Sequence, residues 1–457
     1  MSIESLKNYV FTSKYSRYIP EKMRRETFEE AVDRVIAMHR SHFAAKGIEL
    51  EDLLSLCEQA MKKRMVLGSQ RAMQFGGPPI LRKNARIYNC TTSYCDRPRF
   101  FQEALWLLLC GCGVGFSVQP HHIDKLPGIR KPAAGHATFI IPDTIEGWAD
   151  ALGVLLSSYF TDAQPFPEYA GQIVQFDYTE IRPKGRPISS GMGRAPGPEP
   201  LRRSLEMIRT LVDRRIEEGH GRLRSVDAYD ILMHASDAVL SGGVRRSATI
   251  CLFAPDDELM ATAKTGNWFN ENPQRARSNN SAVLLRNQTT REQFNRLMKS
   301  VKEFGEPGFV WTDHLDMTFN PCGEIGLYPQ IDGVTGFAFC NLCEINMGLV
   351  DNADKFREAC RAAAILGTLQ ADYTDFEYLG EVSTRIAKRE ALLGISMTGM
   401  MENPDVSFDP QLQRDMAKVI LEVNAEVAAR IGINPAARTT CVKPAGTTSS
   451  ILGTSSG

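Results

Sequence analysis

Short apolar runs alternate with helical segments over most of this chain, and this alternation restricts the fold more than any other feature. Runs typical of strands lie at 136–141, 171–178, 281–285, 308–311, 392–397 and 440–442. Helices are expected at 143–159, where Asp143 and Glu146 have the spacing of a capping box, and at 415–430. Strands that alternate with helices are typical of a largely parallel α/β sheet or barrel.

The first 75 residues have a different character, because apolar positions there recur at helical spacing, as at 24–39 and 50–65. We therefore expect a helical N-terminal region at 1–75 and one α/β domain at 76–457. The segment 188–200 is rich in glycine, proline and serine and is expected to be a loop within that domain.

Composition excludes several classes of protein. Of the 457 residues, 43% are hydrophobic and 23% are charged, and the net charge is −1. These values do not suggest a disordered chain or a basic surface that binds nucleic acid. The N-terminus lacks the apolar core of a signal peptide, and no run approaches the roughly 18 apolar residues that span a bilayer. A soluble, cytoplasmic protein without membrane or nucleic-acid partners is expected.

Eleven cysteines in a long chain without a secretory signal indicate reduced thiols rather than a disulfide framework. Three of them, Cys57, Cys251 and Cys360, are interpreted as small buried side chains. Cys340 and Cys343 have C-x-x-C spacing, but a structural zinc site would usually need a second such pair, which the sequence lacks. Thioredoxin-like exchange between these two thiols remains an alternative.

A tight loop is predicted where a thiol, a carboxylate and an amide occur together, at Asn320, Pro321, Cys322, Gly323 and Glu324. Proline fixes its own φ, and glycine turns where other residues do not. On an extended path the side chains of Cys322 and Glu324 would point to the same side, because they are two positions apart. A thiol and an acid in one small volume indicate redox or radical chemistry on a polar substrate.

Two glycine-containing segments are candidates for contacts with a substrate. Gly111, Gly113 and Gly115 lack the spacing of a dinucleotide fingerprint and are expected to let backbone approach a substrate. The second segment offers hydroxyl and backbone N–H groups without charge, as an anion nest does, although a simple Ser/Thr-rich turn is the alternative. It consists of Ala445, Gly446, Thr447, Thr448 and Ser449.

Two pairs of basic residues are given structural interpretations. His121 and His122 resemble metal ligands, but no histidine or carboxylate follows at ligand spacing, so we expect a solvated loop and no metal site. Arg245 and Arg246 are interpreted as ion-pair partners rather than as phosphate contacts.

Taken together and in order, these motifs resemble the catalytic subunit of ribonucleotide reductase. The similarity is greatest to the monomeric, adenosylcobalamin-dependent ribonucleoside-triphosphate reductases, and it runs from about Thr12 to the C-terminus. The matching motifs lie at 18–22, 89–90, 111–117, 143–148, 181–183, 242–248, 278–281, 305–308, 320–324, 340–342, 394–397 and 443–447.

The resemblance implies a fold and a set of catalytic roles. The fold would be the ten-stranded α/β barrel of the reductases, with its last strands absent from this chain. Cys322 would carry a transient thiyl radical that abstracts the 3′-hydrogen, and Glu324 would take the proton of the 3′-hydroxyl. Asn320 would hold the ribose hydroxyls. Cys90 and Cys340 would donate two electrons and end as a disulfide.

The resemblance also implies where nucleotides bind. The substrate phosphates would lie at 445–449, and the substrate would approach the glycines at 111–115. Ser190, Gly193 and Arg194 would belong to a loop that passes the identity of a nucleotide effector to the base site. Arg194 is either a base contact or a solvated charge.

Cofactor and partners follow from the same resemblance. The form of the Cys322 loop favours adenosylcobalamin as the radical source. In the first alternative, a separate small di-metal subunit supplies the radical and this chain binds no cofactor. In the second alternative, the chain is a non-catalytic fragment with an interaction or regulatory role. A ribonucleotide substrate, a nucleotide effector and a thioredoxin-like reductant are the expected partners. The segment between Ser117 and Asp143 is shorter than in the monomeric relatives, where an insertion builds the effector site, so we expect a homodimer.

Overall fold

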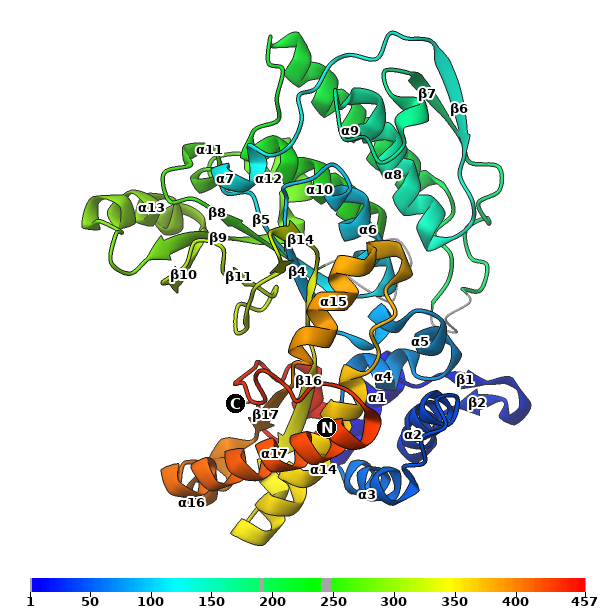
Figure 1. Ribbon diagram of the computed structural model, residues 1–457, viewed down its shortest axis with the longest axis vertical. Helices are drawn as coiled ribbons and strands as arrows, with labels where there is room; N and C mark the ends of the chain where they lie inside the picture. The colour runs from blue at the N-terminus through cyan, green and yellow to red at the C-terminus, as the bar shows by residue number, and fades with distance from the viewer. Residues whose placement is uncertain (1, 189–192, 240–247, 457) are drawn as a thin grey trace. The chain divides into compact units, whose positions relative to one another are not determined.

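The computed structural model of the chain describes residues 2–188, 193–239 and 248–456, which form two compact units (Figure 1). Unit 1 combines both ends of the chain, residues 2–89 and 339–456. Unit 2 contains the described residues between 90 and 338. The domain boundary predicted at residue 75 stays a prediction.

Unit 1 is mostly helical, and its described residues include a three-stranded sheet and a separate pair of short antiparallel strands. Its helices are α1 (Ile3–Lys14), α2 (Phe28–Ala44), α3 (Glu51–Lys62), α4 (Gln70–Phe75), α5 (Pro78–Arg82), α14 (Ala353–Ala371), α15 (Glu381–Glu390), α16 (Pro404–Ser407), α17 (Pro410–Ile431) and α18 (Thr447–Leu452). Its strands are β1 (Tyr18–Ile19), β2 (Arg24–Arg25), β3 (Val66–Leu67), β16 (Leu342–Asn346) and β17 (Gly394–Thr398).

The helices predicted near the N-terminus are confirmed as α2 and α3. Helix α2 begins after a capping box in which Thr27 accepts from the backbone of Glu30 and the Glu30 side chain accepts in return. Its buried residues recur at helical spacing, so one face of the helix packs into the unit.

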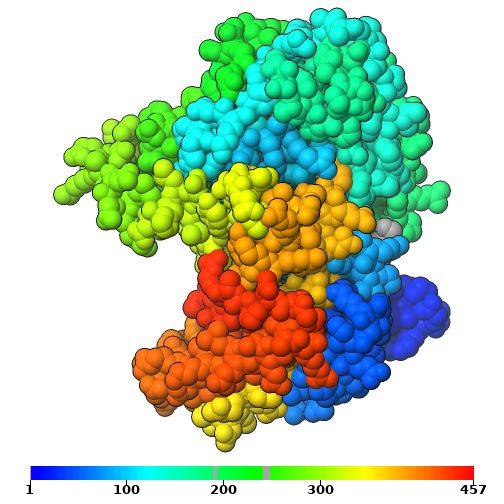
Figure 2. Space-filling view, in the orientation of Figure 1, coloured from blue at the N-terminus to red at the C-terminus, as the bar shows by residue number. Residues whose placement is uncertain are grey.

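Strand β16 forms the centre of the three-stranded sheet, parallel to β17 and antiparallel to β3. All five of its residues are buried, and helix α14 packs on both β16 and α17. Helix α17 begins with a side-chain cap from Asp409 and ends just before Gly432, whose φ of 75° is readily adopted by glycine. Figure 2 shows α17, in orange to red, along the surface of this unit.

One strand predicted in unit 1 does not form. Instead of a strand at 440–442, the segment makes a single parallel bridge between Thr440 and Ile395. The ladder stops because the backbone N–H of Lys443 donates to the Ser396 hydroxyl, at 3.2 Å, instead of to a strand carbonyl.

Unit 2 is built on a parallel sheet. Its helices are α6 (Phe100–Cys110), α7 (Pro120–Ile123), α8 (Ile145–Tyr159), α9 (Glu199–Glu217), α10 (Ser225–Val239), α11 (Glu258–Ala261), α12 (Trp268–Glu271) and α13 (Arg291–Phe304). Its strands are β4 (Cys90–Tyr94), β5 (Gly113–Ser117), β6 (His136–Ile140), β7 (Ile173–Asp177), β8 (Thr249–Phe253), β9 (Ser278–Leu285), β10 (Gly308–Thr312), β11 (Thr318–Phe319), β12 (Gly326–Leu327), β13 (Gln330–Ile331) and β14 (Val334–Thr335).

The main sheet has the strand order β10-β9-β8-β5-β4-β15, where β15 (Ala338–Cys340) begins at the end of unit 2. The strands from β10 to β4 are all parallel to their neighbours, and every residue of β4, β5 and β8 is buried. Parallel strands need cover on both faces, which explains this burial. Helices α6 and α10 pack side by side, with α6 also against β5 (Figure 1).

The predicted α/β class is confirmed, whereas the ten-stranded barrel is not. Among the described residues, the sheet with the most strands has six, and the sheet that contains β16 has three. No helix in this part of the chain is long and apolar enough to cross a membrane.

A second, two-stranded sheet in unit 2 pairs β6 with β7 in parallel, beside α8 and α9. The predicted start of α8 is wrong by one residue, because Thr144 is the cap and its hydroxyl accepts from the N–H of Gly147. The Glu146 carboxylate instead accepts from Trp106 Nε1, at 2.8 Å, and Asp143 pairs with Arg182. Tertiary partners therefore take both side chains of the predicted capping box.

Candidate active site

The predicted loop is the tip of a hairpin formed by β11 and β12. Thr318 pairs with Leu327 and Phe319 with Gly326, so residues 320–325 connect the two strands. At the tip the N–H of Gly323 donates to the carbonyl of Asn320, at 2.8 Å, and Gly323 has a φ of 80°. The tight bend is confirmed. The extended path considered for Cys322 and Glu324 is not what forms, so strand alternation does not set their directions.

Asn320 organises the loop from inside. Its side chain is buried, its Nδ2 donates to Glu324 Oε2 at 2.8 Å, and its Oδ1 accepts from the N–H of Ile325 at 3.0 Å. One amide therefore fixes both the carboxylate and the returning backbone. This arrangement orients Glu324, which is only half-buried.

Burial changes sharply along the loop. Pro321 and Asn320 are buried, Glu324 is half-buried, and Cys322 is exposed. The thiol at the tip is therefore open to an approaching group, while the residues that shape the loop are enclosed.

Two glycines of β5 let the hairpin lie directly on the main sheet. A Cβ atom at Gly115 would lie 2.0 Å from the carbonyl oxygen of Phe319, and one at Gly113 would lie 3.0 Å from Pro321 Cγ. The close approach predicted at these glycines is thus made by the loop's own backbone and proline ring. Gly111 differs, because it ends α6 with a φ of 109°. A substrate contact at these three glycines stays a prediction.

The base of the hairpin is anchored on the sheet as well. Tyr94 donates its hydroxyl to the carbonyl of Asp316, at 2.6 Å, and Gln119 Nε2 donates to the carbonyl of Leu315, at 2.9 Å. The Phe319 side chain packs against the apolar cluster that contains Ile250. These contacts hold the strand that leads to Cys322.

Cys90 begins β4 and is buried beside the same glycines. In the parallel register it pairs with Gly113, whose Cα faces Pro321. Neighbouring strands lie about 4.8 Å apart. Gly113 is therefore close both to the backbone of Cys90 and to the loop. Cys340 is buried too but belongs to unit 1, so its predicted pairing with Cys90 stays a prediction.

The thioredoxin-like alternative finds little support in unit 1. Burial raises the pKa of the Cys343 thiol well above its ordinary value, and its sulfur accepts from Gln370 Nε2 at 3.6 Å. A thiol kept protonated in this way is a poor nucleophile. Cys343 is therefore best explained as part of the core.

The three cysteines predicted to be structural are confirmed as buried, namely Cys57, Cys251 and Cys360. Burial raises the pKa of Cys57 to about 12 and that of Cys360 to about 12. These thiols stay neutral at physiological pH.

The segment predicted to bind phosphates, 445–449, runs into the first turn of the short helix α18. Gly446 has a φ of 53°, a conformation that favours glycine, and it is exposed together with Thr447. Thr448, Ser449 and Ala445 are buried. The hydroxyls already have internal partners: Thr447 Oγ1 lies 2.5 Å from the Tyr15 hydroxyl, and Ser449 donates to the carbonyl of Gly446. Phosphate binding here stays a prediction.

Sequence reasoning missed a buried charge pair next to this segment. Lys443 forms an ion pair with Glu344, which lies on β16 and is almost inaccessible. Burial raises the pKa of Glu344, and the ammonium of Lys443 opposes that shift. The pairing joins two residues 99 positions apart, and neither residue carries a local signal for it.

The predicted effector loop is only partly within the described residues. Ser190 lies outside them, as do the arginines at 245 and 246. Gly193 has a φ of 83°, and Arg194 is exposed and donates to the carbonyl of Gly185 at 2.9 Å. Its guanidinium therefore supports the loop, and a base contact remains open.

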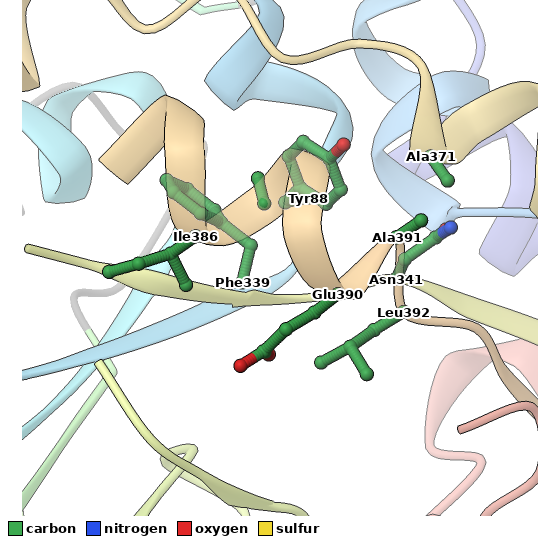
Figure 3. A pocket seen from close by; sticks show the side chains of 9 residues that line it. Tyr88, Phe339, Asn341, Ala371, Ile386, Glu390, Ala391 and Leu392 are labelled. Carbon is green, nitrogen blue, oxygen red and sulfur yellow. The ribbon is translucent and has the colours of Figure 1, made fainter. Parts of the chain in front are cut away.

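Unit 1 also contains a partly open pocket (Figure 3). Phe339 and Asn341 line it, whereas Cys340 between them does not, as expected when alternate side chains point to opposite sides. Both polar atoms of Asn341 are already bonded, to Gly367 and Gln370. The pocket thus lies on the side of this segment away from the thiol.

The interpretation of His121 and His122 as a solvated loop is wrong. His122 is buried, with its Nδ1 2.9 Å from the Ser117 hydroxyl, and its ring stacks on Tyr94. His121 Nε2 lies 2.9 Å from Asp316 Oδ1, and His122 Nε2 lies 3.3 Å from the same oxygen. Local spacing could not reveal this carboxylate, because Asp316 is 195 positions from His121.

Comparisons with known proteins bear on this site. A family model described as the insertion domain of B12-dependent ribonucleotide reductase matches residues 123–212. This stretch contains the β6–β7 sheet with α8 and most of α9. The expectation that such an insertion is absent is therefore wrong, and the argument for a homodimer that depended on its absence falls with it.

Curated relatives extend over nearly the whole chain. It is 24% identical to the adenosylcobalamin-dependent ribonucleoside-triphosphate reductase of Lactobacillus delbrueckii subsp. bulgaricus, across 97% of this chain and 71% of that protein. The reductase of the same name from Lacticaseibacillus paracasei is 25% identical across the same shares. A putative reductase of this kind from Mycobacterium phage D29 is 24% identical, across 98% and 73%.

A solved structure identifies the fold. The crystal structure of a B12-dependent (class II) ribonucleotide reductase matches with a TM-score of 0.82 at 23% identity, covering 100% of this chain and 76% of that one. The fold is thus that of the class II reductases. The resemblance predicted from the motifs is confirmed: along its length the chain is similar to adenosylcobalamin-dependent ribonucleotide reductases.

Proposed function

We propose that this chain is the catalytic subunit of an adenosylcobalamin-dependent ribonucleotide reductase, which reduces ribonucleoside di- or triphosphates to 2′-deoxyribonucleotides. The observation that carries the proposal is the hairpin tip, where an exposed cysteine lies two residues from a carboxylate that a buried amide orients. The names of the curated relatives support a triphosphate substrate.

Three residues of the loop have roles in this reaction. Cys322, as a thiyl radical, takes the hydrogen atom from C3′ and returns it at the end. Glu324 accepts the proton of the 3′-hydroxyl, a task that a positioned carboxylate performs well. Its bond from Asn320 holds the carboxylate in one orientation while the substrate binds.

The two remaining thiols balance the reaction. As the 2′-hydroxyl leaves as water, Cys90 and Cys340 supply two electrons and two protons and become a disulfide. The products are one 2′-deoxynucleotide, one water and one disulfide for each ribonucleotide. A thioredoxin-like dithiol would then restore the thiols, and a nucleotide effector would act through the loop that contains Gly193.

A radical source outside the loop fits the exposure of Cys322. An external group can reach a thiol at an exposed tip without any opening of the core. When bound, adenosylcobalamin would supply the unpaired electron that the proposed chemistry at Cys322 requires. The ten-stranded barrel is part of this proposal, and the parallel sheet under the hairpin supports it.

An anaerobic assay tests the proposal. The full chain is incubated with a ribonucleoside triphosphate, a dithiol, a deoxynucleotide effector and adenosylcobalamin, and the 2′-deoxynucleotide is quantified by chromatography. Product is expected with adenosylcobalamin and not with hydroxocobalamin. Product that forms only when a di-metal subunit replaces the cobalamin would favour the alternative radical source. If neither condition gave product, a non-catalytic role would be favoured.

A further inference from the structure

A compact cluster of two imidazoles and one carboxylate lies at the base of the hairpin, outside the residues that the proposed reaction uses. The ligand atoms of His121, His122 and Asp316 all lie within 4.8 Å of one another. Both Nε2 atoms converge on Asp316 Oδ1, at 2.9 and 3.3 Å. All three residues belong to unit 2, so their arrangement is internal to one compact body.

These distances suit a small divalent ion. Zinc holds nitrogen and oxygen ligands about 2.0–2.1 Å away, so two ligands of a tetrahedral ion lie about 3.3 Å apart. The two distances from Nε2 to Asp316 Oδ1, 2.9 and 3.3 Å, are close to this value. Imidazole with carboxylate is also a donor set that zinc and neighbouring first-row metals accept.

The buried histidine is held in the orientation that a ligand needs. His122 stacks on Tyr94 with ring centroids 4.0 Å apart, and its Nδ1 lies 2.9 Å from the Ser117 hydroxyl. A histidine that binds metal through Nε2 usually gives its other ring hydrogen to such an oxygen. Tyr94 also donates to the backbone carbonyl of Asp316, so one side chain positions two of the three ligands.

The other two ligands are reachable from solvent. The side chains of His121 and Asp316 are 40% and 46% exposed, while that of His122 is 1% exposed. An ion can therefore enter from the open side and meet a fixed imidazole at the back. Three protein ligands leave a coordination position for water, as in open zinc sites.

We propose that His121, His122 and Asp316 bind one divalent first-row transition metal of the zinc type. The ion would join helix α7 to the segment that enters β11, only a few residues before Cys322. The ion would fix the position of the base of the hairpin. No electron or proton of the proposed reaction would pass through the ion.

Metal titration of the full chain tests this site. Chelator-treated, reduced protein without added cobalamin is titrated with Co²⁺ under anaerobic conditions, and zinc affinity is measured by competition with a chromophoric chelator. One Co²⁺ per chain is expected, with the weak ligand-field absorption of nitrogen and oxygen ligands. An intense thiolate-to-metal charge-transfer band would instead place the ion on cysteines and overturn the assignment.

Matched variants locate the ion. His121→Ala and Asp316→Asn change exposed side chains, so both variants are expected to fold. Each should weaken zinc binding by at least about 100-fold, because even the loss of a residue that only hydrogen-bonds to a metal ligand can reduce affinity by that factor. The controls are His136→Ala and Asp313→Asn, which alter an exposed histidine and an exposed aspartate of the same unit. Equal affinity in wild type and both ligand variants would refute the site, as would the absence of tight binding in wild type.

Discussion

Replacing Gly115 by alanine tests how closely the hairpin depends on the sheet beneath it. The added Cβ would lie 2.0 Å from the Phe319 carbonyl oxygen, whereas real Cβ atoms almost never approach closer than 3.0 Å. Strand β5 is buried between β4 and β8 and cannot retreat easily, so the hairpin must move by about 1 Å. Because β11 leads directly to Asn320, the tip with Cys322 moves with it.

The magnitudes separate an effect on activity from an effect on folding. Overpacking of this kind costs about 1–3 kcal/mol of stability, against the roughly 5–15 kcal/mol that keeps a domain folded. The variant should therefore remain folded. A misplacement of about 1 Å at a reacting group, however, can lower turnover about 100-fold.

The assay pairs deoxynucleotide formation with urea unfolding followed by circular dichroism. Gly221→Ala is the matched control, because a Cβ there meets nothing within 4 Å. The turnover of Gly113→Ala should lie between those of Gly115→Ala and Gly221→Ala. Its Cβ would meet the Pro321 ring at 3.0 Å, and the ring can shift to relieve this contact. If Gly115→Ala turned over at the rate of Gly221→Ala, the contact between hairpin and sheet would not position the thiol.

Three further predictions concern the reaction itself. Cys322→Ser should abolish deoxynucleotide formation yet leave the circular dichroism spectrum and nucleotide binding unchanged; measurable product would refute its radical role. After one turnover without reductant, mass spectrometry should find Cys90 linked to Cys340, and a link between Cys340 and Cys343 would contradict the pairing. Glu324→Gln should lower turnover about 10²–10⁴-fold with little change in substrate affinity, and near-normal turnover would show that the carboxylate is not the base.

Local chemistry explains which parts of the structure could be predicted. Helix α17 was recognisable because its apolar stripe and the glycine at 432 are both local signals. The bend at Gly323 was recognisable for the same reason. The α/β class followed from alternation, since parallel strands and their helices each leave a periodic pattern.

Predictions failed where a distant partner decided the outcome. Glu146 has the spacing of a helix cap, but Trp106 takes its carboxylate, and no local pattern contains that information. The glycines at 113 and 115 were expected to let backbone approach a substrate, whereas the group that approaches them in the structure is a segment about 200 positions later in the chain. His122 looked solvated because its partner Asp316 is equally remote.

Asn320 shows how the structure changes the meaning of a motif residue. The resemblance gives its amide to the ribose hydroxyls, but here the side chain is buried and bonded at both ends, to Glu324 and to the N–H of Ile325. An asparagine side chain offers two donor hydrogens and two acceptor lone pairs, so one of each remains after these bonds. A contact with the ribose would therefore be additional to the two hydrogen bonds that the Asn320 side chain makes inside the loop. Removing the amide would release the carboxylate and the backbone together, so a loss of activity in an Asn320 variant would not by itself measure substrate binding.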